Sequence, residues 1–188
     1  SKIDFDLLSR EFAHTRRKNL LLRDLDELVN QQLAKMLFAN PQRIDYYDRY
    51  QEIIDAYNAE QNRATIEKTF MDLMELASSL DTEQQRYVRE GFSSDEELSV
   101  YDLLFSENLT KQEIETIKKV SVDLLTKIKQ QIAKLDHWTD KQETKAIVDN
   151  LIRNTLWQEL PNSYDVSDIQ TYQKKIYEYV YMRYPEVA

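Results

Sequence analysis

The sequence predicts an all-α protein, and two features support this class. The 188 residues include one glycine and three prolines, too few for the repeated turns of a β-rich or α/β protein. Apolar residues recur at steps of three and four, and no segment sustains a period of two. We expect an irregular bundle of about seven or eight helices, forming one domain with two lobes, roughly 1–91 and 92–188, that meet near Gly91.

The first lobe is expected to begin with a long helix from about Phe5 to Phe38, broken or bent near its polar middle, HTRRKN. Asn40-Pro41 ends this helix and begins a second one, since asparagine is a good N-cap and proline suits the first helical position. A third helix spans about Ala64 to Leu80. The expected apolar faces of the second and third helices are Ile44, Tyr47, Ile54 and Tyr57, and Ile66, Phe70, Leu73, Met74, Ala77 and Leu80.

Gly91 is expected at the junction between two helices. Asp81 with Gln84 resembles a capping box that opens a short helix ending at this glycine. Ser94 with Glu97 forms a second box that starts the next helix. A glycine just after a helix adopts the left-handed conformation at little cost. The junction therefore explains Gly91 without a catalytic role.

The second lobe is predicted from three further capping boxes. Thr110 with Glu113 begins a long helix, Thr139 with Gln142 begins the next, which Pro161 stops, and Ser167 with Gln170 begins the last, which ends at Pro185. The expected core positions of these three helices are Ile114, Ile117, Val120, Leu124, Ile128 and Ile132, then Ile147, Leu151, Thr155, Leu156 and Leu160, then Ile169, Tyr172, Ile176, Tyr179 and Val180.

The composition argues against an active site in this chain, and we expect no catalytic, cofactor-binding or metal-binding residue. One glycine cannot build a phosphate-cradling loop, and without cysteine no thiolate zinc site can form. Neither His14 nor His137 lies in a nucleophile-elbow context, and His137 is interpreted as a capping or packing residue beside Trp138. The acidic run at residues 95–97 fits the first turn of a helix better than a cation site.

Two surface features are candidate interaction sites. Arg16, Arg17 and Lys18 form the densest basic cluster, which either contacts DNA or an acidic partner or is a solvated helix face. Because the net charge is −9, any DNA contact must be local. The second feature is a set of tyrosines spaced three and four residues apart, Tyr177, Tyr181 and Tyr184. This spacing predicts an exposed aromatic stripe, which is typical of a protein interface.

The chain is expected to be cytoplasmic, since it has neither a long apolar run nor a signal-peptide pattern. It opens directly on an amphipathic pattern, KIDFDLLSREF, without an initiator methionine, so we interpret it as a fragment of a longer chain.

Five blocks in order resemble a known family: FANPQRIDYYDRYQEIIDAYN, EQQRYVREGFSSDEELSVYDLL, LTKQEIETIKKVSVDLLTKIK, DHWTDKQETKAIVDNLIRNTLWQELP and KIYEYVYMRY. They are similar to the C-terminal helical domain of the R (restriction and translocation) subunit of bacterial type I restriction-modification enzymes. The shared features are an Asn-Pro-x-Arg helix start, a Glu-Glu-Leu-x-x-Tyr-Asp-Leu-Leu block and a tryptophan-led helix ending in Leu-Pro.

The resemblance implies a role in assembly. In that family the whole R subunit is an ATP- and Mg²⁺-dependent DNA translocase and endonuclease, and its last, helical region braces the motor and helps the subunit dock on a methyltransferase core of M and S subunits. No nuclease or ATPase motif matches a position here, so no catalytic residue is carried over. The implied partners are the M and S subunits, the motor domains of the same R subunit, and DNA within the complex. The alternatives are a free-standing helical adaptor and a local DNA-contact module.

Overall fold

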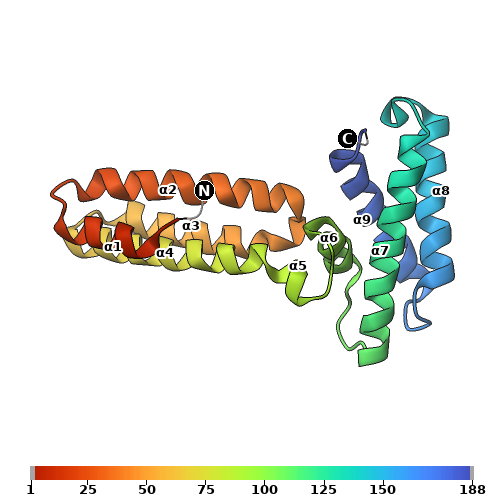
Figure 1. Ribbon diagram of the computed structural model, residues 1–188, viewed down its shortest axis with the longest axis horizontal. Helices are drawn as coiled ribbons and strands as arrows, with labels where there is room; N and C mark the ends of the chain where they lie inside the picture. Colours follow the sequence, from red (N-terminus) through yellow and green to blue (C-terminus); the bar gives the residue numbers. More distant parts are fainter. Residues whose placement is uncertain (1–2, 187–188) are drawn as a thin grey trace. The chain divides into compact units, whose positions relative to one another are not determined.

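The computed structural model describes residues 3–186, and every regular element in this range is helical (Figure 1). Nine α-helices and two short 3-10 helices are described, and no described residue lies in a β-strand. The all-α class is therefore confirmed, with one more helix than predicted because the expected first helix is split into two. The chain divides into two compact units, residues 1–86 and 87–188, and each has its own apolar core.

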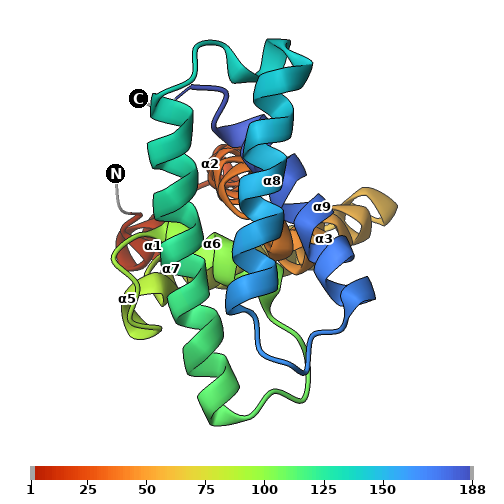
Figure 2. The same cartoon turned by 90° about the vertical axis from the view of Figure 1, so that its right-hand side faces the viewer.

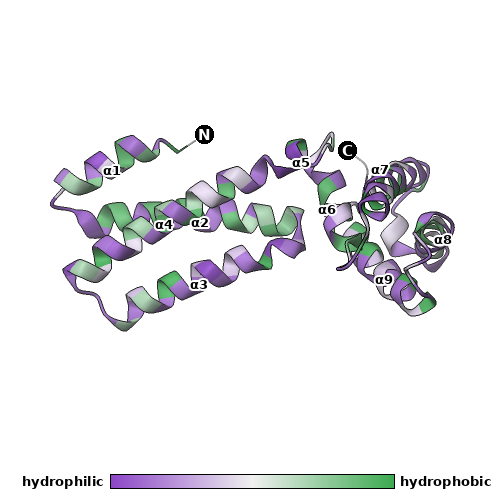
Figure 3. Ribbon diagram, turned by 90° about the horizontal axis from the view of Figure 1, so that it is seen from below, coloured by the Kyte–Doolittle hydropathy of each residue, from purple (hydrophilic) through white to green (hydrophobic). Residues whose placement is uncertain are grey.

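The first unit contains four α-helices and one 3-10 helix. They are α1 (Phe5–His14), α2 (Lys18–Ala39), η1 (Pro41–Arg43), α3 (Ile44–Ala59) and α4 (Arg63–Gln84). The predicted break in the first helix is confirmed and lies at residues 15–17, between α1 and α2. Hydrophobic and hydrophilic residues alternate along the ribbons of α1 to α4 (Figure 3), as expected for helices that bury one face.

Helix α4 is the centre of the first unit. Helices α2 and α3 both pack along α4 but make few contacts with each other. The centre of the core is fully buried, with Val29 and Leu33 from α2 meeting Leu73 and Leu80 from α4. Helix α1 packs on this core through Phe12, whose ring stacks on the ring of Phe70 of α4 at a centroid distance of 3.7 Å.

Two details of the prediction for this unit are wrong. Asp81 does not open a new helix, because α4 continues to Gln84 and its buried stripe extends through Glu83. The carboxylate of Asp81 instead accepts a hydrogen bond from Gln32 of α2, at 3.0 Å. On α3, Ile44 and Tyr47 are exposed, since the helix is rotated so that Tyr50 is its buried residue.

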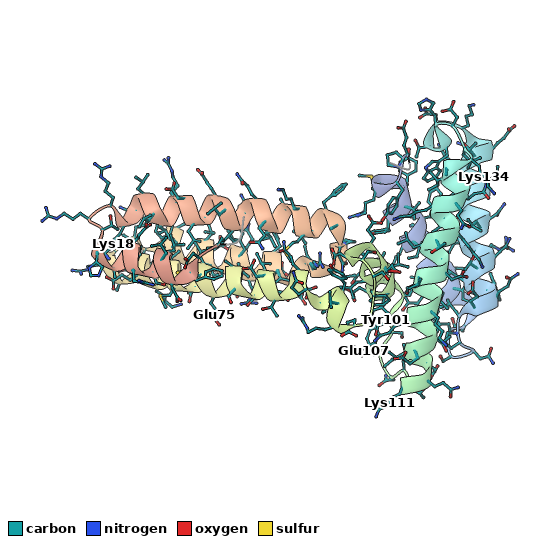
Figure 4. All side chains as sticks on the ribbon, in the orientation of Figure 1. Lys18, Glu75, Tyr101, Glu107, Lys111 and Lys134 are labelled. Atoms are coloured by element: carbon teal, nitrogen blue, oxygen red, sulfur yellow. The ribbon has the colours of Figure 1, made fainter. Side chains whose placement is uncertain are left out.

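The second unit begins within a one-turn helix, whose first residue, Arg86, belongs to the first unit, and continues with four longer helices. Its elements are α5 (Arg86–Arg89), α6 (Asp95–Leu104), α7 (Lys111–Ala133), η2 (Trp138–Asp140), α8 (Gln142–Glu159) and α9 (Val166–Arg183). Helix α6 packs on α7, α7 on α8, α8 on α9, and α9 back on α6, so the four long helices form a closed ring. Figure 2 shows α7 and α8 side by side, and Lys111 and Lys134 mark the two ends of α7 (Figure 4).

The capping predictions for this unit are partly confirmed. Ser94 is the N-cap of α6, and Thr110 with Glu113 forms the predicted box at α7. The box predicted at Thr139 is wrong, because η2 occupies residues 138–140 and α8 begins only after Lys141. The box predicted at Ser167 is also wrong, because the N-cap of α9 is Asp165, paired with Asp168.

The apolar face of α8 differs from the prediction at its start. Ile147 was expected in the core, yet it is 42% exposed. Val148 and Ile152 are fully buried instead. A rotation of one residue about the helix axis separates the two assignments, because both positions are apolar and sit next to each other.

Gly91 closes α5 as predicted. Its φ is +84°, its N–H donates to the carbonyl of Val88 at 3.1 Å, and the N–H of Phe92 donates to the carbonyl of Tyr87 at 2.9 Å. These two bonds are the pattern of a Schellman motif, which needs a left-handed residue at this position.

Gly91→Ala is expected to lower the free energy of unfolding by about 1 kcal/mol, because a side chain destabilises the left-handed conformation. No atom lies within 4 Å of the position that the added Cβ would occupy, so no clash adds to this cost. Urea unfolding of the two proteins measures the difference. A loss above about 3 kcal/mol would contradict a purely conformational origin, and Gly91→Asn should cost less than Gly91→Ala.

Candidate functional site

The predicted basic cluster lies in the turn between α1 and α2, where Lys18 is seen at one end of the first unit (Figure 4). Arg16 and Arg17 are exposed. Lys18 has a structural role: its Nζ donates to the carbonyl of Phe12 at 2.7 Å and lies 4.4 Å from the centre of that ring. Cations near the last carbonyls of a helix stabilise its C-terminus. Of the three predicted residues, Arg16 and Arg17 are therefore exposed, while Lys18 is bound to the end of α1.

The three predicted tyrosines do not form one exposed stripe, and this part of the prediction is corrected. Tyr177 and Tyr181 of α9 make edge contacts with the buried ring of Trp138, at centroid distances of 6.1 and 5.8 Å. Burial raises the pKa of Tyr177, and the nearby charge of Asp149 raises it further. Only Tyr181 of the three is exposed, at 38%.

Tyr184 is half-buried and holds the end of α9. Its backbone carbonyl accepts a hydrogen bond from Nε1 of Trp138 at 2.7 Å, and its ring lies 6.1 Å from that of Tyr179. Burial raises the pKa of Tyr184, and the neighbouring Tyr179 and Glu96 raise it further. Its surroundings indicate a packing role for this side chain.

Sequence analysis missed a buried ion-pair network in the first unit. The side chains of Arg43 and Glu83 are 2% and 7% exposed, and the Arg43 Nε donates to the Glu83 carboxylate at 3.1 Å. Arg86 donates to the same carboxylate at 3.0 Å, and Arg43 also reaches the carbonyl of Met36. The network therefore joins the end of α2, η1 and α4.

The pKa of Glu83 reflects these partners. Burial alone would raise this pKa, but hydrogen bonds and positive charge from Arg86 and Arg43 outweigh burial and hold it below its usual value. The only sequence signal for the pair is the Asn-Pro-x-Arg motif, in which Asn40 caps η1 by accepting from the N–H of Gln42 at 3.1 Å. The other half of the pair lies 40 residues further along the chain, and nothing local indicates it.

The other shared blocks also occupy structural positions. In the Glu-Glu-Leu block, Glu97 is buried and accepts from the N–H of Ser93 at 2.9 Å, while Leu98 and Leu104 are fully buried. Trp138, which leads the tryptophan block, is fully buried. The acidic residues 95–97 occupy the first turn of α6, as predicted. The residues that the blocks share therefore build the core and the helix ends.

A groove of about 460 Å³ in the first unit is lined by residues of α2, α3 and α4. Its lining includes Leu22 of α2, Ile54 of α3, and Thr69 and Leu73 of α4. The Tyr50 hydroxyl, on α3, donates to the Asp26 carboxylate of α2 at 2.6 Å. The lining is mainly apolar and includes no nucleophile with a neighbouring base.

Among residues 3–186, no group of three or more His, Asp or Glu side chains is placed to hold a metal ion. His137 lies at a helix junction as predicted, at the N-cap position of η2 with φ +46°. Its side chain makes no capping hydrogen bond and is 60% exposed, so it does not pack against Trp138. Across the same residues, no helix has the length and apolar character needed to cross a membrane.

Comparison with known proteins gives one match. Residues 1–184 match the model of the family described as type I restriction enzyme HindI endonuclease subunit-like, C-terminal. No curated protein and no solved structure shows a significant match.

Proposed function

We propose that this chain, which belongs to the family of C-terminal domains of type I restriction enzyme HindI endonuclease subunit-like proteins, is a non-catalytic assembly domain. In this role it helps an ATP- and Mg²⁺-dependent DNA translocase and endonuclease subunit dock on a methyltransferase core of M and S subunits, and it braces the motor domains. The active sites, and the ATP and Mg²⁺ that they use, belong to other domains of the parent subunit.

The observation that supports this proposal is the structural position of the residues that the chain shares with the family. Asn40, Arg43, Glu97 and Trp138 are buried or cap helices, so these motifs specify a shape rather than a reaction. A domain whose recognisable residues all maintain its fold contributes to its parent through its surface. This supports an assembly role over a catalytic one.

The exposed end of α9 is the proposed docking surface for the methyltransferase core. Tyr181 is 38% exposed and the adjacent Met182 is 62% exposed, and both are side chains that are enriched at the centres of protein interfaces. The ring of Tyr181 lies against Trp138 and the ring of Tyr177, so it is held in place before a partner arrives. Preorganised aromatic side chains lose little conformational entropy on binding.

The basic turn supports a second candidate, contact with DNA within the assembled complex. Arg16 and Arg17 are exposed, and neither has an ion-pair partner among residues 3–186. Arginines of this kind bind phosphate through charge-assisted hydrogen bonds. The −9 net charge favours a DNA contact that is confined to this turn.

A competition pull-down tests the docking proposal. The 188-residue chain should bind the purified M and S complex, and the complete R subunit should displace it. Tyr181→Glu should weaken binding at least about tenfold, because a charge would enter an interface centre. The matched control is Tyr47→Glu, a tyrosine of equal exposure on α3, which should bind like the unchanged chain.

Each further outcome of the pull-down has one meaning. Binding lost in the double variant R16E/R17E, but kept in Tyr181→Glu, would move the docking site to the basic turn. If the unchanged chain binds the M and S complex only when DNA is present, and R16E/R17E does not bind even then, the DNA contact would be supported. No binding by a well-folded chain would contradict docking through these residues, and binding to a different protein alone would favour the free-standing adaptor.

A further inference from the structure

Helix α8 carries an exposed face that nothing in its unit covers. Ile147 and Trp157 are 42% and 46% exposed, and Asn150 and Asn154 between them are also exposed. Within residues 3–186, none of these four side chains makes a hydrogen bond, ion pair or ring contact. An exposed tryptophan without a partner is uncommon on a monomeric surface and typical of an interface.

The four residues are spaced as the contact face of a coiled coil. Their positions follow one another at steps of three, four and three, which places Ile147 and Asn154 at a positions and Asn150 and Trp157 at d positions. We call these four residues the α8 stripe. A polar asparagine within such a stripe lowers stability but fixes register and partner choice.

The α8 stripe is symmetric about Ile152, which faces the core. Ile147 and Trp157 lie five residues on either side of this point, and Asn150 and Asn154 lie two residues on either side. When two identical helices cross antiparallel about that point, each isoleucine meets a tryptophan and each Asn150 meets an Asn154. This is the self-complementarity that a two-fold interface requires.

The exposed residues around the α8 stripe carry little charge, so charge opposes a second copy less here than over the chain as a whole. The whole chain has a net charge of −9, so most faces of two copies repel each other. The exposed residues from Ala146 to Gln158 include no carboxylate and only one cation, Arg153. The carboxylates of α8 nearest the stripe are both bound, Asp149 by Gln173 and Glu159 by Lys127.

We propose that two copies of this chain associate through an antiparallel pair of α8 helices. The outer layers of the contact are Ile147 against Trp157 of the second copy, and the inner layers are Asn150 against Asn154, whose amides donate to and accept from each other. The face runs from Ile147 to Trp157, eleven residues and about 15 Å of helix. Such an interface is smaller than that of a stable dimer, so we expect a dissociation constant on the order of tens of micromolar.

Sedimentation velocity of the 188-residue chain between about 5 and 500 µM tests the proposal, which does not depend on the methyltransferase. A concentration-dependent dimer is expected, and Trp157→Ala should weaken it at least about tenfold. Met71→Ala is the control, since Met71 is another highly exposed apolar side chain but lies on α4. A monomer throughout, or a dimer that Trp157→Ala leaves unchanged, would overturn the proposal.

Two variants test the antiparallel register. In N150D/N154K each aspartate faces a lysine of the second copy, so this variant should dimerise within a few-fold of the unchanged chain. In N150D/N154D carboxylates face each other, so its dimer should be at least about tenfold weaker. A parallel pair would instead set like charges together in both variants, and equal loss in both would overturn the register. Circular dichroism establishes that each variant is folded, as substitution at exposed positions predicts.

Discussion

Glu83→Gln is expected to lower the free energy of unfolding of the first unit by about 3–5 kcal/mol, the cost of leaving a buried charge without its partner. The Arg43 side chain is 2% exposed, and its charge is balanced by the Glu83 carboxylate. The amide of the variant keeps the size of the side chain but removes the negative charge that also holds Arg86.

The two tryptophans make this loss easy to assign. Both, Trp138 and Trp157, belong to the second unit, so tryptophan fluorescence reports unfolding there, while circular dichroism follows both units. During urea unfolding of Glu83→Gln, the circular dichroism curve should shift and the fluorescence curve should not. The control is Glu67→Gln, which breaks the exposed pair with Arg63 and should cost less than about 1 kcal/mol. Equal effects of the two substitutions would contradict the role of burial.

The same pair gives the first unit a defined pH dependence. The pKa of Glu83 is held below its usual value by Arg86 and Arg43 in the folded chain. A carboxylate of this kind stabilises the fold above the pKa that it has when unfolded, and this contribution is lost as the pH falls through its folded pKa. The difference in stability between the unchanged chain and Glu83→Gln should therefore shrink below about pH 4.5.

Trp138→Ala is expected to destabilise the second unit by about 3–5 kcal/mol, the usual cost of removing a large buried aromatic side chain. Trp138 is fully buried between Tyr177 and Tyr181, and its Nε1 donates to the carbonyl of Tyr184. Urea unfolding followed by Trp157 fluorescence measures the loss. A change below about 1 kcal/mol would show that the cavity collapses or that the ring is not the centre of this core.

Two further variants separate packing from hydrogen bonding. Trp138→Phe keeps an aromatic ring but loses the bond to Tyr184, so it should lie between the unchanged chain and Trp138→Ala. Trp157→Phe, at the exposed tryptophan of α8, should change stability by less than about 0.5 kcal/mol at low micromolar concentration. A Trp157 variant as destabilising as Trp138→Ala would contradict the burial of one ring and the exposure of the other.

Local signals in the sequence predicted some helix ends correctly. Thr110 and Glu113 close a box over three residues, so the signal and the structure occupy the same turn. The asparagine and proline at positions 40–41 and the glycine at 91 fix backbone geometry through their own side chains or the lack of one. These predictions depend on no distant contact.

Predictions failed where packing decides between equivalent local choices. Ile147 and Val148 are both apolar neighbours on α8, and only the packing of α7 and α9 determines which is buried. Asp81 could begin a helix by its own preference, but the buried stripe of α4 carries the helix past it. Arg43 and Glu83 form their pair across 40 residues, a separation that periodicity within one helix cannot reveal. The candidate surface residues show the same limit. Tyr181 and Tyr184 fit the same helical spacing, but only Tyr181 is exposed, because the packing around the end of α9 buries part of Tyr184.

The ring formed by α6 to α9 has a consequence for synthesis on the ribosome. Its closure requires α9 to pack on α6, so the first and last long helices of this unit must both have left the exit tunnel before the core is complete. Among the described residues, the core of the first unit is built from residues between 3 and 80. Domains generally fold as units, with the N-terminal one first during synthesis. The growing chain can therefore hold one finished core while the helices of the second remain incomplete and exposed to chaperones.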